Sequence, residues 1–124
     1  MPIDIEDAVQ GVLNGIDGIT AGASPLPRDF AASLPYAMPV RTGGNTENVI
    51  DTHSVSVDVY AATWAEATNA AALCLKAIRG MELNSFLGSF CYQVSANLPY
   101  NNPDPDNPTI PRVTFLTTIK TRGV

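Results

Sequence analysis

The sequence predicts an α+β fold: a two-layer sandwich in which two helices cover one face of a mostly antiparallel four-stranded sheet. Two segments carry apolar residues at helical spacing, and four carry the alternating apolar and polar residues of strands. In chain order these segments read α-β-β-α-β-β. With 124 residues, 45% of them hydrophobic, the chain is long enough for one core, so we expect a single domain over residues 1–124.

The first helix is expected over residues 4–16, where apolar residues recur every three or four positions. Acidic residues in its first turn lie at the positive end of the helix dipole, and Gly15 and Gly18 are expected to end it. Residues 17–33 are rich in Gly, Ala, Ser and Pro. This composition is typical of an extended crossing segment rather than of a helix or strand.

The first strand is expected over residues 34–41, where two prolines interrupt the alternating pattern. Proline cannot donate a hydrogen bond to a neighbouring strand, so this strand is expected at an edge of the sheet or with a bulge. Residues 42–50 are expected to reverse the chain, because Gly43, Gly44 and Asn45 tolerate positive φ angles.

The second strand is expected over residues 52–61, with its valines facing the core. Thr63 and Glu66 match a capping box, in which the Thr hydroxyl accepts an amide proton and the Glu returns to the Thr amide. The second helix is therefore expected from Thr63 to about residue 79, with Gly80 at its end. Its many alanines would allow the helix to pack closely on the sheet.

A third strand is expected over residues 89–98, and a long loop follows over residues 97–111. The strand residues expected to face inward, unless a bulge inverts them, are Phe90, Tyr92, Val94 and Ala96. The loop is rich in Pro, Asn and Asp, so several φ angles are fixed and backbone donors are few. We expect it to project with a defined shape, as functional loops of this length do.

The fourth strand, over residues 112–122, alternates between two faces. Its odd positions are mostly apolar, whereas Arg112, Lys120 and Arg122 occupy even positions. Three of the seven Lys and Arg residues are therefore expected on one face of one strand. Such a face is either solvated or in contact with an acidic partner.

Charge and composition argue against several classes of protein. The net charge of −5 and the isoelectric point near 4.5 disfavour specific nucleic-acid binding, because that affinity depends on Lys and Arg. No long apolar run is present and the first residues are acidic, so we expect a soluble protein made in the cytosol, without membrane binding. Cys74 and Cys91 have neither metal-site spacing nor a neighbouring His, and are expected to be free thiols.

No group of residues predicts catalysis, so we expect no enzyme activity, no cofactor and no metal. His53 is the one histidine and is expected to be structural, and Cys74 lies in an apolar helix. Asp104 and Asp106 lie in a solvated loop, where neither would acquire the raised pKa of a general acid. Their oxygens could ligate calcium, but the spacing of an EF-hand is missing and a turn-forming loop is the simpler interpretation.

Several short motifs occur in order along nearly the whole chain: Val40-Arg-Thr-Gly-Gly44, Asp51, Val55-Ser-Val-Asp-Val-Tyr-Ala61, Trp64-Ala-Glu-Ala67, Asn97-Leu-Pro99, Pro103-Asp-Pro-Asp106, Pro111-Arg112, Phe115 and Arg122-Gly123. Together they resemble the tail terminator proteins of long-tailed phages, especially those infecting actinobacteria. The resemblance implies an α+β subunit, six copies of which form a ring that caps the tail tube and stops its growth.

The same resemblance implies the partners and the location. The partners would be other copies of the chain, the major tail tube protein and a head-completion or connector protein. The protein would be assembled in the host cytoplasm and lie in the virion at the junction of tail and neck. Another connector subunit, such as a stopper or head-completion protein, remains an alternative. So does a small cytosolic peptide- or ligand-binding module, which should contain a pocket of converging polar and aromatic groups.

A ring requires that one patch of each copy meets a different patch of the next copy. We interpret as contact residues the charged and aromatic side chains of the loop and of the expected outer sheet face: Asp58, Tyr60, Asp104, Asp106, Arg112, Lys120 and Arg122. The basic residues would meet acidic groups of a neighbouring copy. The alternative is that these charges are solvated and contribute little.

Overall fold

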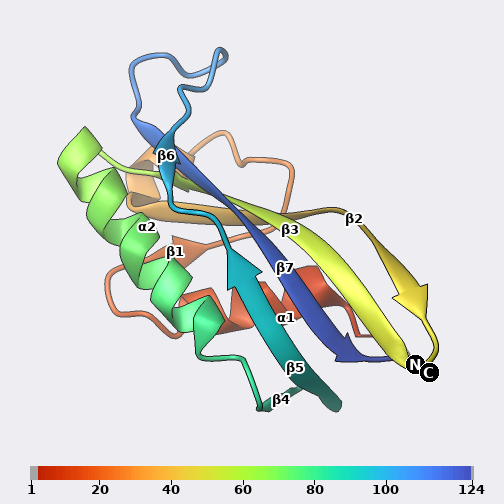
Figure 1. Ribbon diagram of the computed structural model, residues 1–124. Helices are drawn as coiled ribbons and strands as arrows, with labels where there is room; N and C mark the ends of the chain where they lie inside the picture. The colour runs from red at the N-terminus through yellow and green to blue at the C-terminus, as the bar shows by residue number, and fades with distance from the viewer. Residues whose placement is uncertain (1–2, 124) are drawn as a thin grey trace.

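The computed structural model describes residues 3–123 (Figure 1). It contains two α-helices, one short 3₁₀ helix and seven strands. In chain order they are α1 Ile5–Asn14, β1 Thr20–Ala21, the 3₁₀ helix η1 Phe30–Ser33, β2 Tyr36–Glu47, β3 Ile50–Tyr60, α2 Trp64–Arg79, β4 Ser85–Phe86, β5 Ser89–Ala96, β6 Tyr100–Asn101 and β7 Arg112–Arg122.

The predicted fold class is wrong. The sheet has seven strands instead of four, in the order β1-β2-β3-β7-β5-β4 with β6 beside β7, and it curls into a half-barrel. It is also mixed, because β1 is parallel to β2 while the other pairs are antiparallel. The three unforeseen strands have two residues each, which is too short for an alternating pattern. They form only because a long strand is available as a template.

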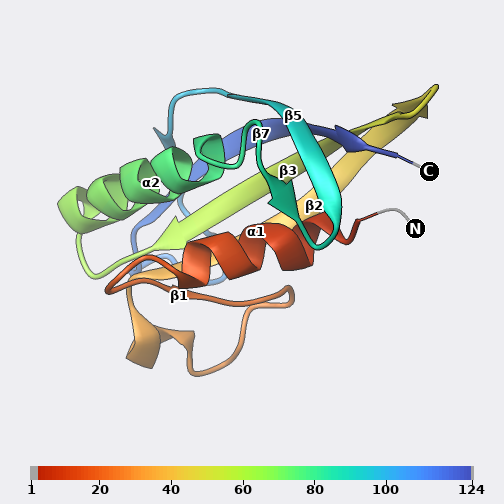
Figure 2. The same ribbon diagram turned by 90° about the horizontal axis from the view of Figure 1, so that it is seen from below.

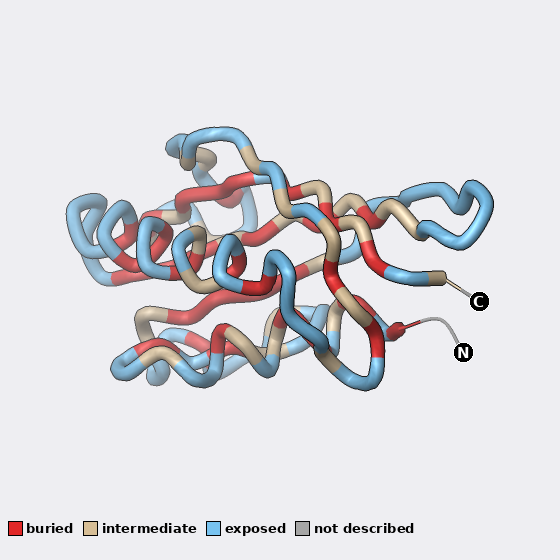
Figure 3. The backbone as a smooth tube through the Cα atoms, turned by 60° about the horizontal axis from the view of Figure 1, so that its bottom comes forward, coloured by how far each residue is buried: buried red, intermediate tan, exposed pale blue. Residues whose placement is uncertain are grey.

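The main core lies between the two helices and one face of the sheet (Figures 2 and 3). Odd-numbered residues of β3 and β7 supply its sheet side, and Val57 and Phe115, which pair across these strands, are completely buried. From the helices, α1 contributes aliphatic residues and α2 mainly alanines. The small alanine side chains allow α2 to lie close to the strands.

Side-chain caps set the beginnings of both helices. The Asp4 carboxylate accepts a hydrogen bond from the Asp7 amide at 3.2 Å, and the Thr63 hydroxyl accepts one from the Glu66 amide, also at 3.2 Å. These bonds satisfy amide groups that have no partner within the helix. The start of α2 is therefore confirmed, although only the Thr63 half of the predicted capping box appears among the side-chain hydrogen bonds of residues 3–123.

Replacing Thr63 with Ala is expected to lower the free energy of unfolding by about 0.5–2 kcal/mol, because the Glu66 amide loses its acceptor. Urea unfolding followed by circular dichroism measures the change. Thr63→Ser is the control, since it keeps a hydroxyl at the cap. Equal stability of Thr63→Ala and the wild type would show that the cap contributes nothing.

The predicted turn at Gly43 and Gly44 is wrong, because both glycines lie inside β2. The chain reverses later, between Glu47 and Ile50, and the two strands form a long hairpin arm (Figure 2). Gly44 has a φ angle of +148°, and a Cβ atom there would collide with the Thr52 carbonyl oxygen. The glycine therefore permits close approach of two strands rather than a turn.

A second, smaller core lies on the opposite face of the sheet. Phe30 of the 3₁₀ helix packs against Tyr60 with ring centroids 4.9 Å apart, and Tyr36 and Met38 complete the cluster. The segment 17–33, expected to be an extended crossing segment, thus also contains β1 and η1. Tyr60, expected on a free face, is only 1% exposed.

A bulge between Cys91 and Gln93 changes which residues of β5 face the core. Cys91 is buried on the core side, contrary to the predicted parity, whereas Val94 packs against the core as predicted. Phe90 and Tyr92 are half-buried and form an edge-to-face pair, with centroids 5.1 Å apart. One extra residue in the strand is enough to shift the alternation.

Candidate functional site

The loop end of the sheet holds a connected set of polar side chains, which we call the loop network: Asp58, Tyr60, Asn102, Asp104, Asn107, Arg112 and Thr114. The Tyr60 hydroxyl donates a hydrogen bond to the Asp104 carboxylate at 2.8 Å. The Arg112 guanidinium lies 3.9 Å from the carboxylates of both Asp58 and Asp104. It also lies over the Tyr60 ring, 5.9 Å from the ring centroid.

Strand register explains why these residues meet. In the β3–β7 ladder, Tyr60 is opposite Arg112 and Asp58 is opposite Thr114. Directly opposed residues have side chains on the same face, so the four side chains are neighbours. The Thr114 hydroxyl donates to the Asp58 carboxylate at 2.7 Å, which completes the sheet part of the network.

Asp104 fixes the shape of the loop. One oxygen of its carboxylate accepts from the Asp106 amide, and the other accepts from the Asn107 side chain, both at 3.0 Å. At the loop base, Arg112 Nε donates to the Asn102 carbonyl oxygen at 2.6 Å. The loop is therefore bonded to the sheet through the same aspartate and arginine that we predicted as contacts with another subunit.

The network changes the pKa values of its members. Burial and the hydrogen bond to Asp104 raise the pKa of Tyr60 to about 12. Burial alone would raise the pKa of Asp104, but the hydrogen bonds from Asn107, the Asp106 amide and Tyr60, together with the charge of Arg112, lower it. Tyr60 thus remains a neutral donor and Asp104 a charged acceptor at neutral pH.

This pKa shift predicts a pH dependence. Because the folded pKa of Asp104 lies below its unfolded value, the carboxylate stabilises the fold fully above about pH 4, and the contribution is lost as the pH falls through the folded value. Asp104→Asn is expected to cost about 1–3 kcal/mol at pH 7. The difference from wild type in urea unfolding should shrink toward pH 2. A difference that does not vary with pH would contradict this assignment.

The predicted contact residues divide into two groups. Asp58, Tyr60, Asp104 and Arg112 are bonded within the chain in the loop network, whereas Asp106 and Arg122 are exposed and Lys120 is half-buried. Arg112 and Arg122 lie at opposite ends of β7, about 30 Å apart along the strand. The predicted basic face is thus not one patch. Contact with other subunits remains a prediction, best retained for Asp106, Lys120 and Arg122.

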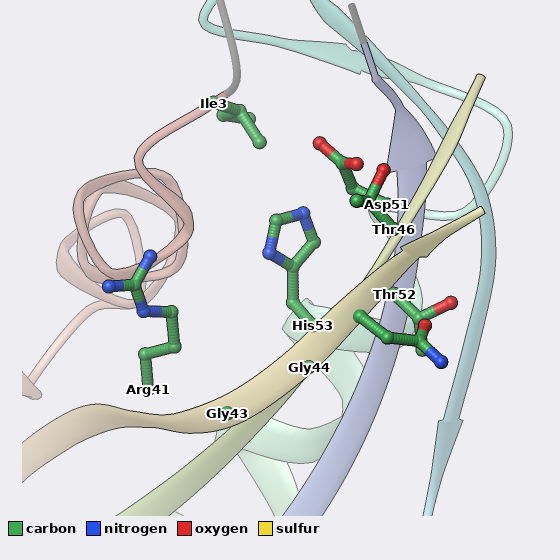
Figure 4. A pocket seen from close by; sticks show the side chains of 9 residues that line it. Ile3, Arg41, Gly43, Gly44, Thr46, Asp51, Thr52 and His53 are labelled. Atoms are coloured by element: carbon green, nitrogen blue, oxygen red, sulfur yellow. The ribbon is translucent and has the colours of Figure 1, made fainter. Parts of the chain in front are cut away.

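The opposite end of the sheet contains a feature that the sequence did not predict. An open pocket of about 630 Å³ lies at the base of the hairpin arm (Figure 4). The His53 ring points into the space between Ile3, Arg41 and Asp51, and the glycines of β2 leave that space open. Two adjacent glycines within an alternating pattern were the available signal.

The histidine in this pocket is held by the sheet. His53 Nε2 lies 2.9 Å from the Thr121 hydroxyl oxygen, and the residue is 8% exposed. Burial lowers its pKa, an effect that the charge of Arg41 adds to and that of Asp51 opposes. In the described part of the chain the His53 ring has no other side-chain hydrogen bond, so the pair lacks the third, orienting group of a triad there.

The remaining candidate residues do not assemble into a site. Cys74 and Cys91 are both buried, and burial raises the pKa of Cys74 to about 12. Among residues 3–123, no cluster of three or more His, Cys, Asp or Glu side chains is placed to hold a metal ion. None of the helices in that part of the chain has the length and apolar composition needed to cross a membrane.

Comparison with known proteins gives one informative result. No protein-family model matches the chain. No curated protein matches it either. Among solved structures, it is similar to a chain of a structure described as "Virion of native gene transfer agent (GTA) particle", with a TM-score of 0.53 and 14% sequence identity. The match covers 96% of this chain and 95% of that chain, so the two share a fold over almost their full lengths.

Proposed function

We propose that the chain is a structural protein of a virion that caps the tail tube as a ring of six copies. The ring would stop tube growth and provide the surface that joins the tail to the head connector. The observation that carries the proposal is the fold shared over nearly the whole chain with a component of a virion particle. The order of the sequence motifs supports the narrower role of tail terminator.

The distribution of projecting segments fits a subunit that lies between two other assemblies. The loop 97–111 projects from one end of the sheet, and the tip of the hairpin arm projects from the other (Figure 1). All residues from Arg41 to Ile50 are exposed (Figure 3). In this proposal one end contacts the major tail tube protein and the other a head-completion or connector protein, and the chain has no catalytic role.

The direct test is the assembly state of the purified protein. Native mass spectrometry and negative-stain electron microscopy should reveal a ring with a central hole, either in solution or on isolated tail tubes. A ring that binds a head connector but not tail tubes would favour the stopper or head-completion alternative. A protein that remains monomeric in solution and on tubes would contradict the proposal.

Reversing the charge of Lys120 and Arg122 is expected to separate folding from assembly. Neither side chain belongs to the loop network, so Lys120→Glu/Arg122→Glu should change the free energy of unfolding by about 0.5 kcal/mol or less per residue. Like charges brought together at an interface cost several kcal/mol. Thermal unfolding tests the fold, and electron microscopy of tails tests length control and head joining. If the folded double variant still gives tails of normal length that join heads, Lys120 and Arg122 do not lie in the interface.

A further inference from the structure

The sheet has two open edges, one on each side. At one side, β1 covers β2 only at Tyr36 and Ala37, and within residues 3–123 no second strand lies beside the rest of this twelve-residue strand. At the other side, β4 and the residues just before it cover β5 from Ser89 to Cys91 and leave its remaining residues open. Open edges offer unpaired backbone groups to another strand.

The outward-pointing groups of β2 follow from the strand register. The Ala37 carbonyl oxygen accepts from Gly22 at the outer edge, so alternate residues up to Arg41 point outward. Beyond the bulge after Arg41, Gly44 and Thr46 take the outward positions. The Arg41 amide is already engaged, because it donates to the Glu6 carboxylate at 2.7 Å.

The outer edge of β5 has a matching arrangement. The Cys91 amide donates outward to the Asn84 carbonyl oxygen at 2.8 Å, and beyond the bulge Val94 and Ala96 point the same way. The Val94 amide donates to the Glu82 carboxylate at 3.0 Å. At each open edge, a glutamate carboxylate thus accepts the hydrogen bond of one outward amide. Charged side chains protect other sheet edges in the same way.

We propose that the outer edge of β2 in one copy pairs with the outer edge of β5 in the next copy. Three antiparallel pairings separate β2 from β5, so the two strands run in opposite directions within one subunit. Rotation about an axis along the strands preserves these directions, and the two edges then meet as an antiparallel pair. Because the edges differ, the contact is heterologous and repeats around a ring.

Charge at the two edges supports a second copy as the occupant. Arg41 is exposed on the β2 edge beside Glu6, whose carboxylate accepts from the Arg41 amide, and Glu82 is exposed on the β5 edge. In the assembled pair, Glu6 and Glu82 release the Arg41 and Val94 amides to the opposite strands, and the Arg41 side chain lies between the two carboxylates. This inference rests on the proposed ring, and it assigns the contact that closes the ring.

The first test removes one outward amide. When Arg41 lies opposite Val94, the Ala96 amide faces the Pro39 carbonyl oxygen of the neighbouring copy, and Ala96→Pro removes this N–H, which β7 does not use. Ala96→Ser is the matched control, because it changes the side chain and keeps the N–H. We expect Ala96→Pro to raise the concentration needed for ring assembly by about tenfold or more, and Ala96→Ser by about threefold or less, in native mass spectrometry.

The second test exchanges the charges and does not depend on proline being accommodated. Arg41→Glu should raise the concentration needed for assembly by about tenfold or more, and Arg41→Glu/Glu82→Arg should return it to within about threefold of wild type. Circular dichroism verifies folding. Rings that form equally well with Ala96→Pro and Arg41→Glu would overturn this contact while leaving the proposed function intact. A wild-type protein that never forms rings would overturn both.

Discussion

Replacing Arg112 with Glu is expected to lower the free energy of unfolding by about 3 kcal/mol. The substitution places a third carboxylate beside those of Asp58 and Asp104, which are each 3.9 Å from the guanidinium in the wild type. It also removes the hydrogen bond that Arg112 Nε donates to the Asn102 carbonyl oxygen, and the positive charge over the Tyr60 ring. Urea unfolding at pH 7 measures the loss.

Lys120→Glu is the matched control for this prediction. Lys120 lies on the same face of β7 and undergoes the same charge reversal, but it has no ion-pair partner within residues 3–123. Its cost should be about 0.5 kcal/mol or less. If Arg112→Glu were as stable as Lys120→Glu, the loop network would not hold the loop on the sheet. Arg112 and Lys120 were equivalent in the sequence pattern. In the structure, Arg112 has ion-pair partners in the loop network and Lys120 does not.

Replacing Phe115 with Ala is expected to cost about 3–5 kcal/mol, because the ring is completely buried at the centre of the main core. The neighbouring substitution Leu116→Ala is the control, since Leu116 is 47% exposed on the other face and should cost about 1 kcal/mol or less. Thermal or urea unfolding of both variants gives the comparison.

The contrast between these neighbours tests the orientation of the central strand. Similar costs for Phe115→Ala and Leu116→Ala would mean that β7 does not present its odd positions to the helices. Because β7 pairs with β3, β5 and β6, a change in its orientation would displace the core and the loop network together. The prediction therefore concerns the whole sheet.

The position of the loop network matters for the proposed assembly. Four of the seven predicted contact residues stabilise the loop within the chain, so substitutions there would disturb folding and assembly together. Asp106, Lys120 and Arg122, together with the edge residues Arg41 and Ala96, are better positions for separating the two effects. Variants at these positions change the surface while leaving both cores intact.

The sequence by itself determined the elements that depend on local signals. The Thr63 cap, the spacing of apolar residues in the first helix and the alternation of valines in residues 52–61 all have structural counterparts. These signals lie within a few residues of one another, and the same side chains that produce the pattern form the helix or strand. The odd face of β7 was recognisable for the same reason.

The tertiary structure alone decided features that depend on residues far apart in the chain. β1, β4 and β6 exist because a long strand lies beside them. Gly44 lies inside a strand, where the nearby Thr52 carbonyl oxygen leaves no space for a Cβ atom. Tyr60 and Asp104 are 44 residues apart, and only the fold brings phenol and carboxylate within hydrogen-bonding distance. Burial and pairing at these positions depend on what packs against them, which no local pattern records.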